Sequence, residues 1–193
     1  MAGLAERNSI PPLWPADPGF ATMLRLILEQ QVSLASADAA FRRLEESIDP
    51  VGPETFLTLN ADELRKIGFS RQKTGYVRGV ASSVLDGSID FDAIGRMGDA
   101  AATARLLEIR GVGPWTAACY LLFSLRRPDV WPPGDRALQV AVGRLDGLAA
   151  VPGVEEATRR AMTWRPLRSV AARMLWHEYL GGPAEDSFGE GRL

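Results

Sequence analysis

The sequence predicts an all-α protein built from roughly nine or ten short helices. Apolar residues recur at helical spacing in nearly every segment, beginning with Phe20–Leu28, and almost no segment alternates as a half-buried strand does. Residues with good N-cap chemistry precede several of these segments. They are Ser33, Ser70, Asp99 and Asn60, the last followed three residues later by Glu63 in the pattern of a capping box.

The chain length suits one large domain or two small lobes that share a cleft. We expect helices near residues 20–28, 33–44, 62–66, 70–87, 99–109, 115–125, 135–145, 153–163 and 166–180. We expect residues 1–181 to form one unit of two interleaved lobes, about 20–100 and 101–145, with the termini packed alongside. The polar, Gly-rich residues 182–193 are expected to form a flexible tail.

Composition excludes several classes of site. Cys119 is the single cysteine and His177 the single histidine, so neither an internal disulfide nor a four-cysteine iron–sulfur cluster can form. A zinc site rich in sulfur and nitrogen ligands is excluded for the same reason. No apolar run approaches a membrane span, and the N-terminus lacks signal-peptide architecture, so we expect a cytoplasmic protein.

The most informative segment, Leu106–Ala117, predicts two helices that meet across a very tight turn. Gly111 and Gly113 permit positive φ and the close approach of another backbone. Pro114 suits the first position of the second helix, whose free N-terminal amides favour an anion such as a DNA phosphate. A plain αα-hairpin with a glycine C-cap is the alternative interpretation of this segment.

Asp135 follows Trp115 by twenty residues, across the Pro- and Gly-rich stretch 127–134. Taken alone, Gly134-Asp135 before an apolar helical segment is typical of an ordinary Asp N-cap. An aspartate at this position can serve both as a helix cap and as a functional carboxylate.

Together these features resemble the helix-hairpin-helix (HhH-GPD) DNA glycosylase superfamily. The matching motifs are Leu-x-x-Ile-x-Gly-Val-Gly-x-x-Thr-Ala at the hairpin, the aspartate spacing, Gln-Gln-Val-Ser at 30–33 and Trp-Arg-Pro-Leu-Arg-Ser at 164–169. The nearest branch is the 3-methyladenine DNA glycosylase II type. This resemblance implies two helical lobes around a cleft, without the separate N-terminal β domain of some members.

The resemblance implies an enzyme that flips an alkylated base from double-stranded DNA and hydrolyses its N-glycosidic bond, leaving an abasic site. Asp135 would be the catalytic carboxylate, stabilising the oxocarbenium character that develops at the sugar. Members that also cut the strand have a lysine where this chain has Trp115, so no lyase activity is expected. A non-catalytic helix-hairpin-helix DNA-binding module, or a glycosylase for a different lesion, is the alternative.

The remaining expected site residues follow from the same resemblance. The pocket for the base would be lined by Trp115, Trp176, Cys119 and His177. DNA contacts would come from Gln31, Gly111, Gly113, Thr116, Arg71 and Lys73. The backbone carbonyls of Leu107, Ile109 and Val112 would bind a monovalent cation, Na⁺ or K⁺, with no other cofactor.

Two positions depart from the family pattern. Gln31 stands where alkylation-repair members often have an apolar wedge, and Cys119 stands where some relatives have a pocket tyrosine, which implies a roomier pocket. Arg165 and Arg168 either contact DNA or pair with acidic residues, and for Arg168 the structural role is favoured. The expected partner is damaged duplex DNA, bound by a monomer with no membrane contact.

Overall fold

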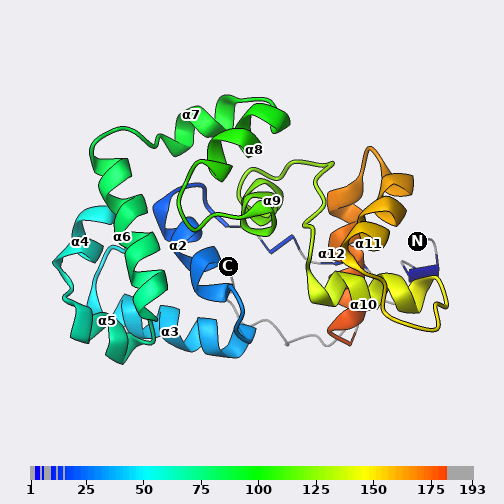
Figure 1. The fold of residues 1–193 in the computed structure, drawn as a ribbon, viewed down its shortest axis with the longest axis horizontal. Helices are drawn as coiled ribbons and strands as arrows, with labels where there is room; N and C mark the ends of the chain where they lie inside the picture. The colour runs from blue at the N-terminus through cyan, green and yellow to red at the C-terminus, as the bar shows by residue number, and fades with distance from the viewer. Residues whose placement is uncertain (1–2, 5, 7–9, 12, 15, 182–193) are drawn as a thin grey trace.

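The computed structural model describes residues 3–4, 6, 10–11, 13–14 and 16–181, and over these residues it is helical without any strand (Figure 1). This confirms the predicted all-α class. The expected tail, residues 182–193, lies outside the described residues.

The helices follow one another with short connections. They are α2 (Phe20–Glu29), α3 (Leu34–Ser47), α4 (Pro53–Thr58), α5 (Ala61–Ile67), α6 (Arg71–Leu85), α7 (Phe91–Arg96), α8 (Asp99–Leu107), α9 (Pro114–Phe123), α10 (Arg136–Leu145), α11 (Val154–Ala161), the 3₁₀ helix η1 (Met162–Trp164) and α12 (Arg168–Tyr179). None of the helices in the described part of the chain is long and apolar enough to cross a membrane.

Two short helices, α4 and α7, were not predicted, and the expected number of helices was therefore too low. Each has six residues, fewer than two turns, which is too short to display a helical apolar period. The N-caps at Ser33, Asn60 and Ser70 are confirmed by side-chain hydrogen bonds to the first turns that follow them. The prediction that Asp99 caps a helix was wrong, because Asp99 is the first residue of α8 and the N-cap of this helix is Gly98.

Two central helices, α2 and α9, organise the fold. Every residue of α9 from Thr116 to Phe123 is buried, because this helix is apolar around its whole circumference. Nearly all of α2 is buried too, including the charged Arg25. They pack against each other; α2 also packs on α3 and α6, and α9 on α8. The C-terminal end of α2 and the N-terminal end of α9 therefore lie close together.

A second group of helices, α10 to α12, lies on the other side of α9 (Figure 1). Within it, α10 packs against both α11 and α12. The lobe boundary expected at about residue 100 would place α2 and α9 in different lobes, although these two helices pack against each other. We propose that the boundary between the lobes lies in the loop 124–135, which leads from α9 to α10.

This loop is fixed to the start of α12. The guanidinium of Arg168 donates to both carboxylate oxygens of Asp129, at 2.7 and 3.0 Å, and the Val130 amide donates to Ser169 Oγ at 2.9 Å. Arg165 Nε also donates to Asp129. Both arginines therefore pair with an acidic residue, and the loop that ends at Asp135 is held in one conformation.

Candidate active site

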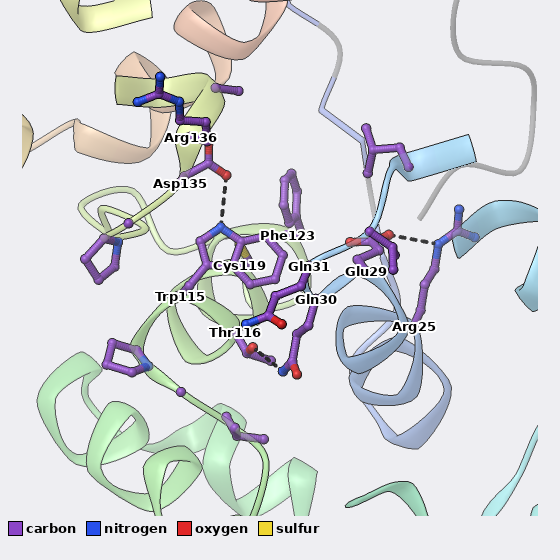
Figure 2. A pocket seen from close by; sticks show the side chains of 18 of the residues that line it. Arg25, Glu29, Gln30, Gln31, Trp115, Thr116, Cys119, Phe123, Asp135 and Arg136 are labelled. Atoms are coloured by element: carbon purple, nitrogen blue, oxygen red, sulfur yellow. Dashed lines mark hydrogen bonds and ion pairs between the residues drawn. The ribbon is translucent and has the colours of Figure 1, made fainter. Parts of the chain in front are cut away.

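A cavity of about 1250 Å³ opens where the ends of these helices converge. Its walls come from the C-terminal end of α2, the length of α9, the N-terminal turn of α10 and the C-terminal half of α12, with side chains of α3 and α6 at one side. Figure 2 shows several of these side chains. Side chains far apart in the sequence thus surround one space. That volume is ample for a single heterocyclic base.

Asp135 presents its carboxylate to this cavity from the N-cap of α10. Its Oδ2 accepts from Trp115 Nε1 at 2.9 Å, and its Oδ1 accepts from Trp176 Nε1 at 3.1 Å and from the Leu138 amide at 2.8 Å. A negative charge is also favoured at a helix N-terminus. The carboxylate is consequently both a helix cap and a rigidly oriented charge on the cavity wall.

Two indoles stand beside this charge. Trp115 is half-buried at the start of α9, and Trp176 is buried on α12, where its ring stacks on Phe123 with centroids 5.3 Å apart. An indole face attracts a cationic ring more strongly than a neutral one. The wall can therefore hold a flat, positively charged ligand next to a carboxylate.

The turn between α8 and α9 is tied to α2 and α6. Gly111 has φ 92° and lies against the ring of Tyr76, leaving no room for a side chain. Gln30 Nε2 donates to the Gly111 carbonyl and to Thr116 Oγ1, both at 2.9 Å. The side chain of Thr116 is buried, and this hydrogen bond helps to fix the turn. Its expected contact with DNA stays a prediction.

The last residues of α2 reach the rim of the cavity. Gln31 is exposed there with φ 57°, and Gly113, with open space around it, lies on the same rim. Lys73 Nζ donates to the Leu28 carbonyl at 2.6 Å, and burial lowers the pKa of this lysine. Arg71 is exposed at the first position of α6.

Cys119 and His177 differ in their placement. Cys119 is fully buried at the floor of the cavity, where burial raises the pKa of its thiol well above the ordinary value. The thiol is therefore neutral and shapes the cavity rather than reacting. His177 follows Trp176 on α12 but does not line the cavity wall.

No group of three histidine, cysteine, aspartate or glutamate side chains is arranged to hold a metal ion among the described residues. The three carbonyls expected to bind a monovalent cation belong to the α8–α9 turn. Ile109 and Val112 are buried and Leu107 is exposed, and the Ile109 carbonyl accepts the Val112 amide at 2.9 Å. This hydrogen bond uses one of the two lone pairs of the Ile109 carbonyl oxygen.

Residues 24–166 match the model of the HhH-GPD superfamily base excision DNA repair proteins. The chain belongs to this superfamily. It is 28% identical to DNA-3-methyladenine glycosylase 1 of Schizosaccharomyces pombe over 162 residues, which are 81% of this chain and 71% of that protein. It is 29% identical to YfjP of Bacillus subtilis, covering 91% of this chain and 64% of YfjP, somewhat less than two thirds of that relative.

Solved structures of HhH-GPD proteins share the fold. A DNA-3-methyladenine glycosidase from Bacillus halodurans is 31% identical with a TM-score of 0.72, over 89% of this chain and 80% of that one. The S. pombe 3-methyladenine DNA glycosylase Mag1, in complex with abasic DNA, has a TM-score of 0.86 at 24% identity, over 91% and 89% of the two chains. At 24% identity, the similarity to Mag1 shows a shared fold and nothing more.

Four residues of this HhH-GPD site were not predicted from the sequence: Glu29, Gln30, Tyr76 and Phe123. Glu29 and Gln30 stand beside Gln31 in the segment that resembles the family, so their place at the end of a buried helix was a usable signal. Tyr76 and Phe123 have no local signal. Their roles depend on contacts with Gly111 and Trp176, which lie 35 and 53 residues further along the chain.

Proposed function

We propose that this chain is a monofunctional DNA glycosylase that excises alkylated bases of the 3-methyladenine type. The observation that carries this proposal is the carboxylate of Asp135, oriented by two indole N–H groups and a helix N-terminus, on the wall of a cavity large enough for a base. The names of the S. pombe relative and the B. halodurans structure support the same activity.

In this proposal the damaged nucleotide leaves the duplex and its base enters the cavity. A base that already carries a positive charge stacks on the indole faces and is a good leaving group. As the N-glycosidic bond stretches, positive charge develops at the sugar, and the fixed negative charge of Asp135 stabilises it. Water then adds to C1′ and leaves an abasic site.

The DNA backbone would lie along the α8–α9 turn. Gly113 leaves space for a phosphate beside the N-terminal amides of α9, and the exposed Arg71 adds a positive charge nearby in the same lobe. Gln31, at the rim, would enter the gap left by the flipped base. The carbonyls of Leu107, Ile109 and Val112 would hold Na⁺ or K⁺ between turn and phosphate. We propose that the protein acts on DNA as a monomer in the bacterial cytosol.

Trp176→Phe tests how the carboxylate is oriented. The change removes the N–H that bonds Asp135 Oδ1 but keeps an aromatic ring against Phe123. We expect the rate of 3-methyladenine release under single-turnover conditions to fall by roughly 10-fold, because one hydrogen bond to the charged group is lost. Unfolding temperature serves as the control. An unchanged rate would mean that Trp176 contributes only its ring.

The chemistry itself is tested with methylated duplex DNA. Trp115 has no amine to attack C1′, so free 3-methyladenine should be released while the strands stay intact until alkali is added. Borohydride added during the reaction should trap no covalent protein–DNA complex. A trapped complex would show an amine nucleophile elsewhere in the chain and overturn the monofunctional mechanism.

A further inference from the structure

A buried cation, Arg173 of α12, lies behind the aromatic wall of the cavity. Its side chain does not line the cavity, and the residue is only 7% exposed. Its guanidinium lies over the ring of Phe123, which does line the cavity (Figure 2), with the guanidinium carbon 5.1 Å from the ring centroid. The mechanism above assigns no role to Arg173.

This guanidinium has few partners for a buried charge. Its Nη2 donates to the Leu122 carbonyl at 3.0 Å, while Nη1 has no hydrogen-bond partner among the described residues. Burial and the charge of Arg126, another cation, lower the pKa of Arg173 to about 10, so the group is still charged at neutral pH. A buried charge without an acidic partner is costly, so stability alone does not account for an arginine here.

Helix capping accounts for one of its contacts only. Leu122 belongs to the last turn of α9, and the last carbonyls of a helix have no partner within it. A cation is also favoured at a helix C-terminus. Such a cap needs only one N–H group, and it leaves the contact of the guanidinium with the Phe123 ring unexplained.

A series of contacts leads from Arg173 to Asp135. The guanidinium lies over the ring of Phe123, and this ring stacks on Trp176 with centroids 5.3 Å apart and an angle of 20° between the planes. Trp176 Nε1 donates to Asp135 Oδ1 at 3.1 Å. The direction of this indole N–H therefore depends on where the Phe123 ring lies.

Side chains, rather than close helix packing, connect α9 with α12. The close neighbours of α9 are α2 and α8, and those of α12 are α10 and η1. Yet the two indoles that bond Asp135 come from α9 and α12, at Trp115 and Trp176. Arg173 and Trp176 are three residues apart on one face of α12, and both contact Phe123 of α9. This junction therefore determines how the two indoles are placed about the carboxylate.

We propose, on the premise of the glycosylase function above, that Arg173 is a positioning residue for Asp135. Its guanidinium holds the ring of Phe123 against Trp176 while it bonds the Leu122 carbonyl, and Trp176 in turn keeps its N–H on the carboxylate. Arginine suits this role, because its planar group can lie on a ring and still donate a hydrogen bond at its edge.

Exchange of the Trp176 indole hydrogen with solvent measures this positioning without any substrate. The chain has five tryptophans, and the indole signal that is missing from the magnetic resonance spectrum of Trp176→Phe is that of Trp176. In Arg173→Met, which keeps a long side chain without the guanidinium, this hydrogen should exchange at least about 10-fold faster. The indole of Trp131, which packs on Trp164, is the internal reference. Exchange at the wild-type rate would overturn the proposal.

The rate of base release tests whether this positioning serves catalysis. Arg173→Met should release 3-methyladenine about 10-fold more slowly under single-turnover conditions, with the DNA concentration for half-maximal rate unchanged. The double variant with Trp176→Phe should be no slower than Trp176→Phe alone, because both changes remove the same hydrogen bond. Losses that multiply to about 100-fold in the double variant would contradict action through Trp176.

Arg78→Met is the matched control for the loss of a guanidinium. Arg78 is half-buried on α6, donates to the Leu59 carbonyl and does not line the cavity. Its replacement should lower the unfolding temperature and leave both base release and Trp176 exchange unchanged. Equally slow release by this variant would show that lost stability alone slows the reaction, and would contradict the proposal.

The two proposals fail in different ways. Wild-type protein that binds methylated DNA and releases no base overturns the proposed function, and the role of Arg173 with it. Release of 3-methyladenine by Arg173→Met at the wild-type rate overturns the role of Arg173 alone. If Arg173→Met does not fold, Arg173→Lys replaces it, since it keeps the charge without the planar group. Release should again slow, and a wild-type rate would contradict positioning by the guanidinium.

Discussion

Asp135→Asn is expected to slow release of 3-methyladenine at least about 100-fold, the order of effect seen when one electrostatic stabiliser of a transition state is removed. The amide carries no negative charge to oppose the charge that develops at the sugar. It also directs an N–H group towards one of the two indole N–H donors that now bond the carboxylate. The measurement is the rate under single-turnover conditions.

The variant should fold, because an asparagine oxygen can still accept the Leu138 amide and cap α10. Its affinity for duplex DNA with an abasic site should equal or exceed that of the wild type, since a negative charge near the backbone is gone. Asp146→Asn, at the opposite end of α10, is the matched control and should retain full excision. Near-normal excision by Asp135→Asn would remove this carboxylate from the mechanism.

Gly111→Ala is expected to destabilise the protein by about 3 kcal/mol, through steric overlap and backbone strain combined. A Cβ at this position would lie 2.4 Å from Cγ of Tyr76, and the residue has φ 92°. The unfolding temperature should fall by roughly 10 °C, as thermal denaturation followed by circular dichroism would measure. DNA affinity should fall too, because the turn and its tether to Gln30 must shift.

Gly113→Ala is the matched control for that loss of stability. Its φ is −95° and a Cβ would meet no atom of the protein within 4 Å, so the unfolding temperature should hardly change. Weaker binding of duplex DNA by this stable variant would then report the approach of a DNA backbone to the turn. If Gly111→Ala unfolds at the wild-type temperature, the packing of Tyr76 against the turn does not stabilise the fold.

Helix periodicity, caps and turn residues were sufficient to predict most of the fold. Ser33 and Ser70 cap helices through the hydrogen bonds expected of them, and Pro114 opens α9 as its ring geometry favours. The helices α4 and α7 were missed because six residues cannot show a period, so their position is set by packing, as in the contact of α4 with α6.

The site could be predicted only where local chemistry carries the signal. Asp135 is an example, because an N-cap directly after a Pro-rich loop that ends in Gly134 is visible in the sequence, and the structure gives it a cap hydrogen bond. That both Trp115 and Trp176 bond the same carboxylate depends on how α12 packs on α10. Thr116 illustrates the converse, since its hydrogen bond with Gln30, 86 residues away, could not be predicted from the sequence.

The most direct test of the central claim is a product count with the wild-type protein and methylated duplex DNA. We expect free 3-methyladenine and an equal number of abasic sites, with every strand intact before alkali treatment. Tight binding of the DNA with no free base, and no abasic sites, would contradict the claim and leave a DNA-binding module without catalysis.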